Sequence, residues 1–258
     1  MRELTVADTE AASTIARGAF AGKTILITGA NGGLGMKLVE AFVGAGAGRI
    51  LAAGRSPVSW PHAAVSGVVL DVCNEQQIDA IATAHMRDVD ILINNAGLNH
   101  NSRFLNVDAE SARREMEVNY FGTLRMIRAF APAMRDRGSG TIVNIISSGA
   151  YASFPNMGSY CASKAALHLL TQSVRAELGY YGVSVVAAYP PAVDTRMSTH
   201  VPAEHKMAPE RVAAELLAGL RDEREDIHVG MAADFYERVR REPKAVEAML
   251  KARAAPRD

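Results

Sequence analysis

The sequence has few cysteines, no excess of charge and no long apolar run. Its two cysteines, Cys73 and Cys161, are too few for a disulfide framework and lack metal-ligand spacing, so we expect a cytoplasmic setting and no metal. Lys and Arg total 28 and Asp and Glu total 28, which argues against a nucleic-acid or membrane-surface partner. No apolar stretch approaches the roughly 18 residues of a membrane span. We therefore expect a soluble protein.

The chain length and apolar content predict one large domain. Its 258 residues are 48% hydrophobic, which is enough for a substantial core. Residues 1–20 precede the first apolar run and are interpreted as an N-terminal extension. Residues 21–258 are then the folded domain, and the charged tail after Gly230 is expected to be helical.

Short apolar runs alternate with longer amphipathic segments. The runs predict buried strands at residues 23–28, 49–53, 67–72, 90–95, 141–147 and 183–190. Helices are expected at residues 35–44, 74–85, 109–137, 160–178 and 209–221. The alternation is typical of an α/β fold with a Rossmann-type doubly wound parallel sheet. Pro57 and Pro61 exclude a full helix from the short crossover at residues 55–67.

A glycine-rich loop joins the first predicted strand to the first helix. A tight turn that lets a pyrophosphate approach the backbone needs residues without Cβ, and the new helix offers free N–H groups. A bare glycine turn would be the alternative interpretation. The loop predicts a dinucleotide site formed by Gly29, Asn31, Gly32, Gly33, Leu34 and Gly35.

Tyr160 and Lys164 lie four residues apart on a predicted helix, so their side chains share one face. A phenol is a poor base at neutral pH, but a nearby ammonium stabilises the phenolate. Tyr160 is therefore the predicted acid/base, and Lys164 the group that supports it. The alternative interpretation is that the pair has no catalytic role and is only a half-exposed tyrosine beside a solvated lysine.

Taken in order, several motifs resemble the classical short-chain dehydrogenase/reductase family. They are the TGANGGLG loop at 28–35, NNAG at 94–97, Asn119, a serine, and the YCASK segment at 160–164. The likeness covers about residues 21 to 200. It implies a nicotinamide cofactor, and it places the serine 13 residues before Tyr160, which selects Ser147 over Ser148.

The resemblance assigns roles to the other motif residues. Ser147 would orient the substrate oxygen, Asn119 would position a water for proton relay, and Lys164 with Tyr160 would contact the cofactor. Asn119 could instead only bond its own helix backbone. Further cofactor contacts are implied at Asp71, Val72, Asn95, Ala96, Gly97, Pro190, Val193 and Thr195. The family's glycine after Pro190 is replaced here by Pro191, which restricts the loop and removes an N–H.

The cofactor choice depends on the end of the second strand. A carboxylate there would bind a free ribose 2′-hydroxyl, whereas an arginine would pair with a 2′-phosphate. This strand ends in Gly54, Arg55 and Ser56, so Arg55 favours NADP(H), with Asn31 as a second candidate. The alternative is that Arg55 is only an exposed surface residue.

These features predict an NADP(H)-dependent oxidoreductase acting on a carbonyl or alcohol. The pocket is expected to be lined by Tyr151, Phe154, Asn156, Met157, Pro191 and Met197, which favours a medium-sized, largely apolar substrate. An imine reductase, epimerase or cyclase on the same scaffold, or a non-enzymatic NADP(H)-binding regulator, are alternatives. The resemblance also implies a homodimer or homotetramer.

Overall fold

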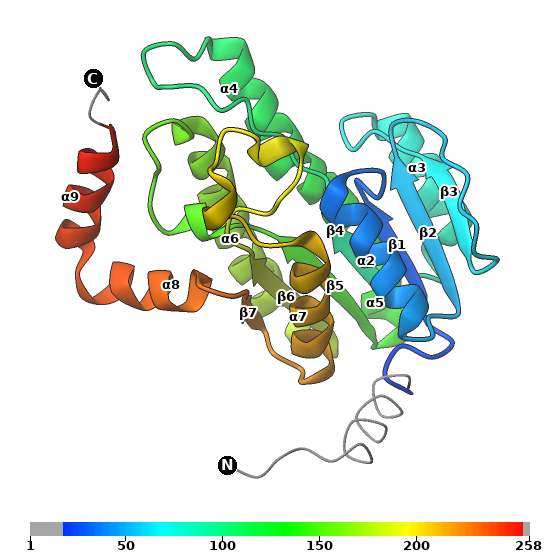
Figure 1. Ribbon diagram of the computed structural model, residues 1–258. Coiled ribbons are helices and arrows are strands. Elements are labelled where there is room, and N and C mark those ends of the chain that lie inside the picture. The colour runs from blue at the N-terminus through cyan, green and yellow to red at the C-terminus, as the bar shows by residue number, and fades with distance from the viewer. Residues whose placement is uncertain (1–17, 255–258) are drawn as a thin grey trace.

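The predicted apolar runs form one parallel sheet in the computed structural model, which describes residues 18–254 (Figure 1). Seven strands lie in the order β3-β2-β1-β4-β5-β6-β7. Their bounds are β1 Thr24–Thr28, β2 Arg49–Gly54, β3 Val65–Val69, β4 Ile91–Asn94, β5 Gly140–Ile145, β6 Val183–Tyr189 and β7 Asp226–His228. The chain passes from β3 at one edge to β4 beyond β1, so the strand order reverses between β1 and β4. In such sheets this reversal is where ligands bind.

Helices cover both faces of the sheet, because the strands are apolar on both sides. Helices α2 (Gly33–Gly44) and α7 (Pro209–Arg221) pack together on one face, over Ile25 and Ile27. Helices α3 (Glu75–His85), α5 (Thr123–Arg137) and α6 (Gly158–Gly179) cover the other face, over Leu26. The doubly wound α/β prediction is confirmed. None of the described helices combines the length and apolarity needed to cross a membrane.

The predicted helix at residues 109–137 contains an irregular turn at its centre. Helix α4 (Ala109–Met116) passes through a π-helical segment, Glu117–Gly122, into α5. Such wide turns occur often at functional sites, and this one carries Asn119. A side chain at Gly122 would place its Cβ 2.6 Å from Val72 Cγ2, so the segment lies directly against the loop after β3.

Two strand predictions need correction. The third strand runs over Val65–Val69 rather than 67–72, because Asp71 leaves the sheet and its N–H donates to Gln77 Oε1 at 2.7 Å. The seventh strand was missed, since β7 has three residues and only Ile227 among them is buried. As expected, no helix forms between β2 and β3.

The chain ends of the described part differ from each other. Helices α8 (Ala232–Arg241) and α9 (Pro243–Ala254) confirm the predicted helical tail. Most of the predicted extension, residues 1–17, lies outside the described residues. Its last residue, Phe20, is buried and packs edge-on against Phe42 with ring centroids 5.2 Å apart.

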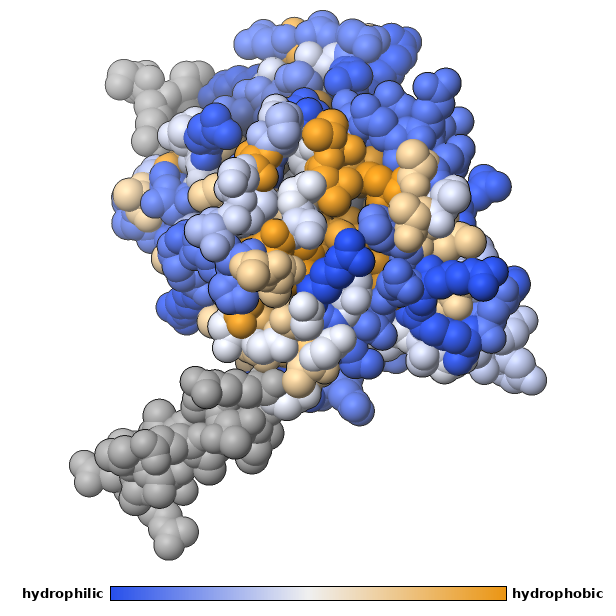
Figure 2. All heavy atoms as spheres, turned by 90° about the vertical axis from the view of Figure 1, so that its right-hand side faces the viewer, coloured by the Kyte–Doolittle hydropathy of each residue, from blue (hydrophilic) through white to orange (hydrophobic). Residues whose placement is uncertain are grey.

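The face that carries β2 and β3 shows apolar side chains gathered centrally among hydrophilic ones (Figure 2).

Candidate active site

The glycine loop between β1 and α2 is built from close backbone contacts. Gly29 has φ +65°, and a Cβ there would lie 2.9 Å from the Cα of Ala96. A Cβ at Gly35 would lie 2.2 Å from the carbonyl oxygen of Gly29. These separations are shorter than non-bonded contacts allow, so only glycine fits without moving the backbone.

The N-terminus of α2 is open toward this loop. No side chain caps it, and Gly32 donates its N–H to the carbonyl of Gly29 at 3.1 Å. Thr195, from the loop after β6, lies against Gly33, where a Cβ would come within 2.7 Å of Thr195 Cγ2. Leu34 follows in the first turn, which therefore offers backbone N–H groups and a positive dipole end to an anion. The residues present fit a bound pyrophosphate.

The end of β4 fixes the glycine loop from the other side. Asn95 Nδ2 donates to the carbonyls of Thr28 and Gly29 at 3.0 and 3.2 Å. The Thr28 hydroxyl accepts the N–H groups of Asn95 and Ala96, both at 3.0 Å. The Asn95 side chain thus supports the loop backbone. Gly97 continues past it toward Lys164.

The end of β2 presents Arg55 to solvent. Arg55 is exposed and forms no ion pair with any described residue. Asn31 Nδ2 donates to the carbonyl of Ser56 at 2.7 Å and lies over Gly54, where a Cβ would come within 2.4 Å of that nitrogen. Asn31 therefore links the glycine loop to the turn that carries Arg55.

Asp71 and Val72 lie just past β3 on the same side of the sheet. Asp71 Oδ1 accepts the N–H of Cys73 at 2.9 Å, and Val72 is buried. Val72 lies against the π-helical segment, as the Gly122 contact shows.

Asn119 connects the segment after β4 to α6. Its Oδ1 accepts the N–H of Leu98 at 2.8 Å, and its Nδ2 donates to the carbonyl of Leu98 at 2.9 Å. The same nitrogen donates to Ser163 Oγ at 2.8 Å, and Asn119 is fully buried. The side-chain amide is thus fully used inside the protein.

Lys164 is buried beside these groups. Its Nζ donates to the carbonyl of Ile145 at 2.9 Å, at the end of β5. A Cβ at Gly97 would lie 3.7 Å from Nζ and 3.4 Å from Asn119 Oδ1, so three segments converge here. Burial lowers the pKa of Lys164 to about 8. At neutral pH the ammonium form of Lys164 therefore predominates, but it loses its proton more easily than a lysine in water.

Tyr160 faces Lys164 and Ser147. The Lys164 Nζ lies 5.9 Å from the centroid of the Tyr160 ring, and the tyrosine is half-buried. Burial raises the pKa of Tyr160, the Ser147 side chain opposes this by hydrogen bonding, and nearby Cys161 and Glu115 add to the increase. The phenol is therefore held in its protonated form.

Ser147 and Ser148 point to different roles in the structure. Ser147 Oγ accepts the N–H of Gly149 at 3.0 Å, which aligns it at the end of β5. Ser148 begins a short 3₁₀ turn and donates its N–H to the carbonyl of Pro190 at 3.1 Å. The interaction with Tyr160 thus belongs to Ser147, and the turn to Ser148.

The loop after β6 is closed on itself by Met207. The N–H of Met207 donates to the carbonyl of Ala192, and Asp194 donates to the carbonyl of Met207, both at 2.8 Å. Val193 bridges to Met207 as well. These contacts hold Thr195 against the glycine loop despite Pro191, which follows Pro190 at the start of the loop.

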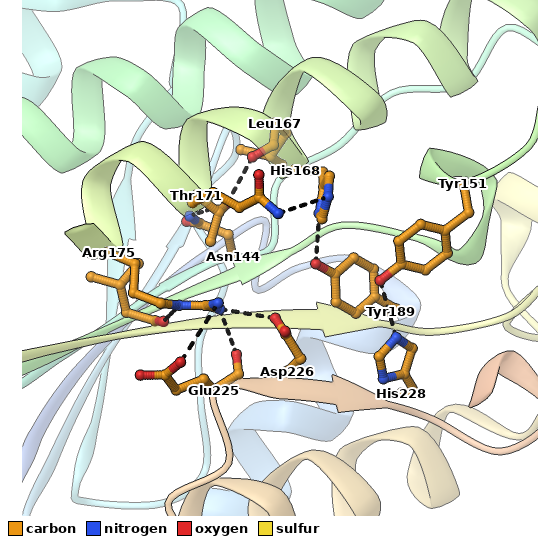
Figure 3. A network of polar contacts seen from close by, with 12 residues as sticks. Asn144, Tyr151, Leu167, His168, Thr171, Arg175, Tyr189, Glu225, Asp226 and His228 are labelled. Carbon is orange, nitrogen blue, oxygen red and sulfur yellow. Dashed lines mark hydrogen bonds and ion pairs between the residues drawn. The ribbon is translucent and has the colours of Figure 1, made fainter. Parts of the chain in front are cut away.

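Two of the expected pocket residues pack against aromatic side chains from the later part of the chain. Tyr151 packs among Tyr189, His228 and Tyr236, with its hydroxyl 3.0 Å from His228 Nε2 (Figure 3). Phe154 stacks on Phe235 of α8, with ring centroids 5.8 Å apart. Aromatic side chains of β6, β7 and α8 thus surround these two rings.

Asn156 and Met157 remain beside the site. Met157 Sδ accepts from Asn99 Nδ2 at 3.2 Å, and Asn156 donates to Asn101 Oδ1. The segment 98–101 is therefore a wall that sequence reasoning missed. Sequence reasoning also missed Glu115, whose carboxylate accepts the N–H of His100 in this segment. A single acid in a charged helix gives no sequence signal.

The comparisons identify the family. The short chain dehydrogenase family matches residues 23–206, so the chain belongs to this family. The probable oxidoreductase EphD of Mycobacterium bovis is 33% identical over 199 residues, covering 70% of this chain and 33% of EphD. The chain thus matches about a third of the length of that relative.

Two solved structures show the same fold. A short chain dehydrogenase from Burkholderia cenocepacia in complex with NADP is 38% identical, with a TM-score of 0.85 over 92% of this chain and 99% of that one. A short chain dehydrogenase/reductase from Burkholderia phymatum in complex with NAD is 26% identical, with a TM-score of 0.76 over 93% and 98%. Nicotinamide cofactors of both kinds therefore occur among similar proteins.

Proposed function

We propose that this protein is an NADP(H)-dependent oxidoreductase that interconverts a carbonyl compound and an alcohol. The observation that carries the proposal is the convergence of Ser147, Tyr160 and buried Lys164 at the carboxyl ends of the central strands. The glycine loop lies on the same side of the sheet: Gly29 packs against Ala96, and the next residue, Gly97, lies beside Lys164 Nζ. Family membership and the complexes of its relatives support the same conclusion.

Each side chain has a role that its contacts support. Bound NADPH supplies the hydride. The protonated Tyr160 gives its proton to the substrate oxygen, which suits carbonyl reduction. Ser147 holds that oxygen, and the Lys164 ammonium stabilises the charge left on the phenolate. Asn119 fixes Leu98 and Ser163 around Lys164; its expected role in positioning a water stays a prediction.

The preference for NADP(H) rests on Arg55. No carboxylate ends β2, and the guanidinium is free for a 2′-phosphate. The relative at 38% identity was solved with NADP and the one at 26% with NAD, so the more similar of the two supports the phosphorylated cofactor. Residues at Asp71, Val72, Ala96, Pro190 and Val193 stay proposed cofactor contacts.

We also propose a largely apolar substrate and a homo-oligomer in the cytoplasm. Met157 and Met197 border the site, and Met197 is 41% exposed. Leu169 on α6 is 63% exposed and Phe121 is 42% exposed, which leaves apolar surface for a second copy. Mass photometry of the purified protein tests the oligomer directly.

The test of the function is NADPH oxidation screened over ketones, aldehydes and imines. We expect turnover of a ketone or aldehyde, and we expect Tyr160→Phe to abolish it while NADPH still binds. A silent panel with tight NADPH binding would contradict the reductase. Turnover that survives in Tyr160→Phe would contradict the acid/base role of Tyr160, and imine-only turnover would change the substrate class.

A further inference from the structure

Glu115 is a buried acid that the proposed mechanism does not use. It lies in α4, and its exposed fraction is 1%. One carboxylate oxygen, Oε1, accepts the N–H of His100 at 2.7 Å. The other, Oε2, is buried and has no hydrogen-bond partner among the described residues. A carboxylate kept in this state is costly, so its retention calls for a reason.

Glu115 and Asn119 hold one segment from the same helix face. They are four residues apart, and each accepts a backbone N–H from the chain that follows β4. Asn119 Oδ1 accepts the N–H of Leu98 at 2.8 Å, and Glu115 Oε1 accepts the N–H of His100 at 2.7 Å. Two consecutive turns of the helix therefore fix alternate residues of the segment.

The opposite side of this segment touches the loop that leads into Tyr160. Asn99 Nδ2 donates to Met157 Sδ at 3.2 Å, and Met157 immediately precedes α6. Asn101 has φ +51°, a left-handed conformation that asparagine tolerates better than most residues, and its Oδ1 accepts from Asn156. The segment is therefore tied to the loop before Tyr160 at two consecutive side chains, Asn156 and Met157.

We propose that Glu115 is a positioning residue of the active site, which holds residues 98–101 as a fixed wall beside Tyr160. This inference rests on the proposed reductase function. It assigns to Glu115 a role that neither the cofactor loop nor the Tyr160 and Lys164 pair supplies.

The electrostatic surroundings of Tyr160 agree with this placement. Burial is the main cause that raises the pKa of Tyr160, the Ser147 side chain lowers it by hydrogen bonding, and Cys161 and Glu115 add smaller increases; the Lys164 Nζ lies over the ring. Burial also raises the pKa of Cys161, to which Glu115 again adds a smaller increase. Both directions agree with an acid held on the Tyr160 side of helix α4.

Amide hydrogen exchange tests the wall without requiring turnover. In the wild-type protein the His100 N–H should be protected, although the His100 side chain is exposed. Glu115→Met should speed its exchange about tenfold or more, because the acceptor is lost. Glu115→Gln retains an acceptor and should restore protection, while Glu110→Gln, an exposed acid of the same helix, should change nothing. An unprotected His100 N–H in the wild type would overturn the proposal.

Phenol titration tests whether Glu115 acts on Tyr160. Ultraviolet difference titration of the NADP⁺ complex, with Tyr160→Phe subtracted, follows Tyr160 alone. Glu115→Gln should move its midpoint to lower pH, because Glu115 adds to the increase in the pKa of Tyr160, and Glu110→Gln should not. An unchanged midpoint would overturn the positioning role at Tyr160, even if exchange is altered. Failure of NADP⁺ to bind would instead refute the proposed function, while the exchange experiment would still decide the wall.

Discussion

The glycine loop and the region around Tyr160 are built in opposite ways. In the loop, shape comes from side chains that are missing: Gly29, Gly33 and Gly35 allow approaches that a Cβ would block. Around Tyr160, shape comes from polar side chains that bond across the fold. Asn119 reaches Ser163, and Lys164 reaches the end of β5.

Because of this difference, the two regions should be sensitive to opposite kinds of substitution. A backbone-built site fails when any atom is added, because close-packed main chain cannot yield cheaply. A side-chain-built site fails when one polar partner is removed, because its neighbours lose position or charge. The predictions below test each kind of failure.

Replacing Lys164 should give the largest effect. Lys164→Met removes the ammonium beside Tyr160, and we expect kcat to fall by about 10²- to 10⁴-fold. The free energy of unfolding should not fall correspondingly, since a buried charge that is costly to desolvate is also removed. Steady-state kinetics and urea unfolding measure both, with exposed Lys244→Met as control. A kcat within tenfold of the wild type would contradict the assigned role.

Adding one methyl group to the loop should come second. Gly35→Ala places a Cβ 2.2 Å from the Gly29 carbonyl, so the turn must shift. We expect a loss of about 1–3 kcal/mol in the free energy of unfolding and roughly 10- to 100-fold weaker NADPH binding. Gly44→Ala, at the other end of α2 with open space around it, should leave binding intact. Fluorescence titration with NADPH decides, and equal binding by both variants would be inconsistent with the backbone argument.

Reversing the charge at the end of β2 should sharpen the cofactor choice. Arg55→Glu should weaken NADPH binding about tenfold and change NADH binding little, because only the 2′-phosphate meets the new carboxylate. Arg49→Glu, at the opposite end of the same strand, is the matched control. If Arg55→Glu weakened NADPH and NADH binding equally, a specific contact between Arg55 and the 2′-phosphate would be excluded.

The smallest effect should be a pH dependence in the aromatic cluster behind the site (Figure 3). Burial lowers the pKa of both His168 and His228. Below about pH 6.5 the unfolded chain therefore binds protons that the folded chain refuses, so the free energy of unfolding should fall as the pH falls below that value. The loss should be shallow, since both rings are partly open to water.

Urea unfolding at several pH values measures this slope. His228→Phe keeps a ring for stacking against Tyr189 and should flatten part of it. His205→Asn, an exposed residue, should leave the slope unchanged. A stability that rises toward acid pH would contradict the direction given for these imidazoles.

The fold and the motif residues were largely readable from the sequence. Six apolar runs predicted six strands, because buried parallel strands are apolar on both faces. The TGANGGLG loop and the Tyr160–Lys164 spacing are local features, so they can be recognised in the sequence without knowledge of the fold. Their placement together near Gly97 agrees with the predicted site, while the roles of these residues stay predictions.

Other features could not be read in advance. Tyr151 packs with Tyr189, His228 and Tyr236, which β6, β7 and α8 supply from far along the chain. Strand β7 itself is too short to give a periodic signal. The pairing of His100 with Glu115 joins residues 15 apart through a loop of no regular period.

The sequence by itself determined the doubly wound order of elements, the glycine turn and the spacing of Tyr160 and Lys164, since each depends on neighbours within a few residues. Only the tertiary structure decided which side chains surround Tyr160. Burial, the free Oε2 of Glu115 and the closure of the Pro191 loop by Met207 arise from contacts between distant segments. Those contacts exist only once the sheet has brought the strand ends together.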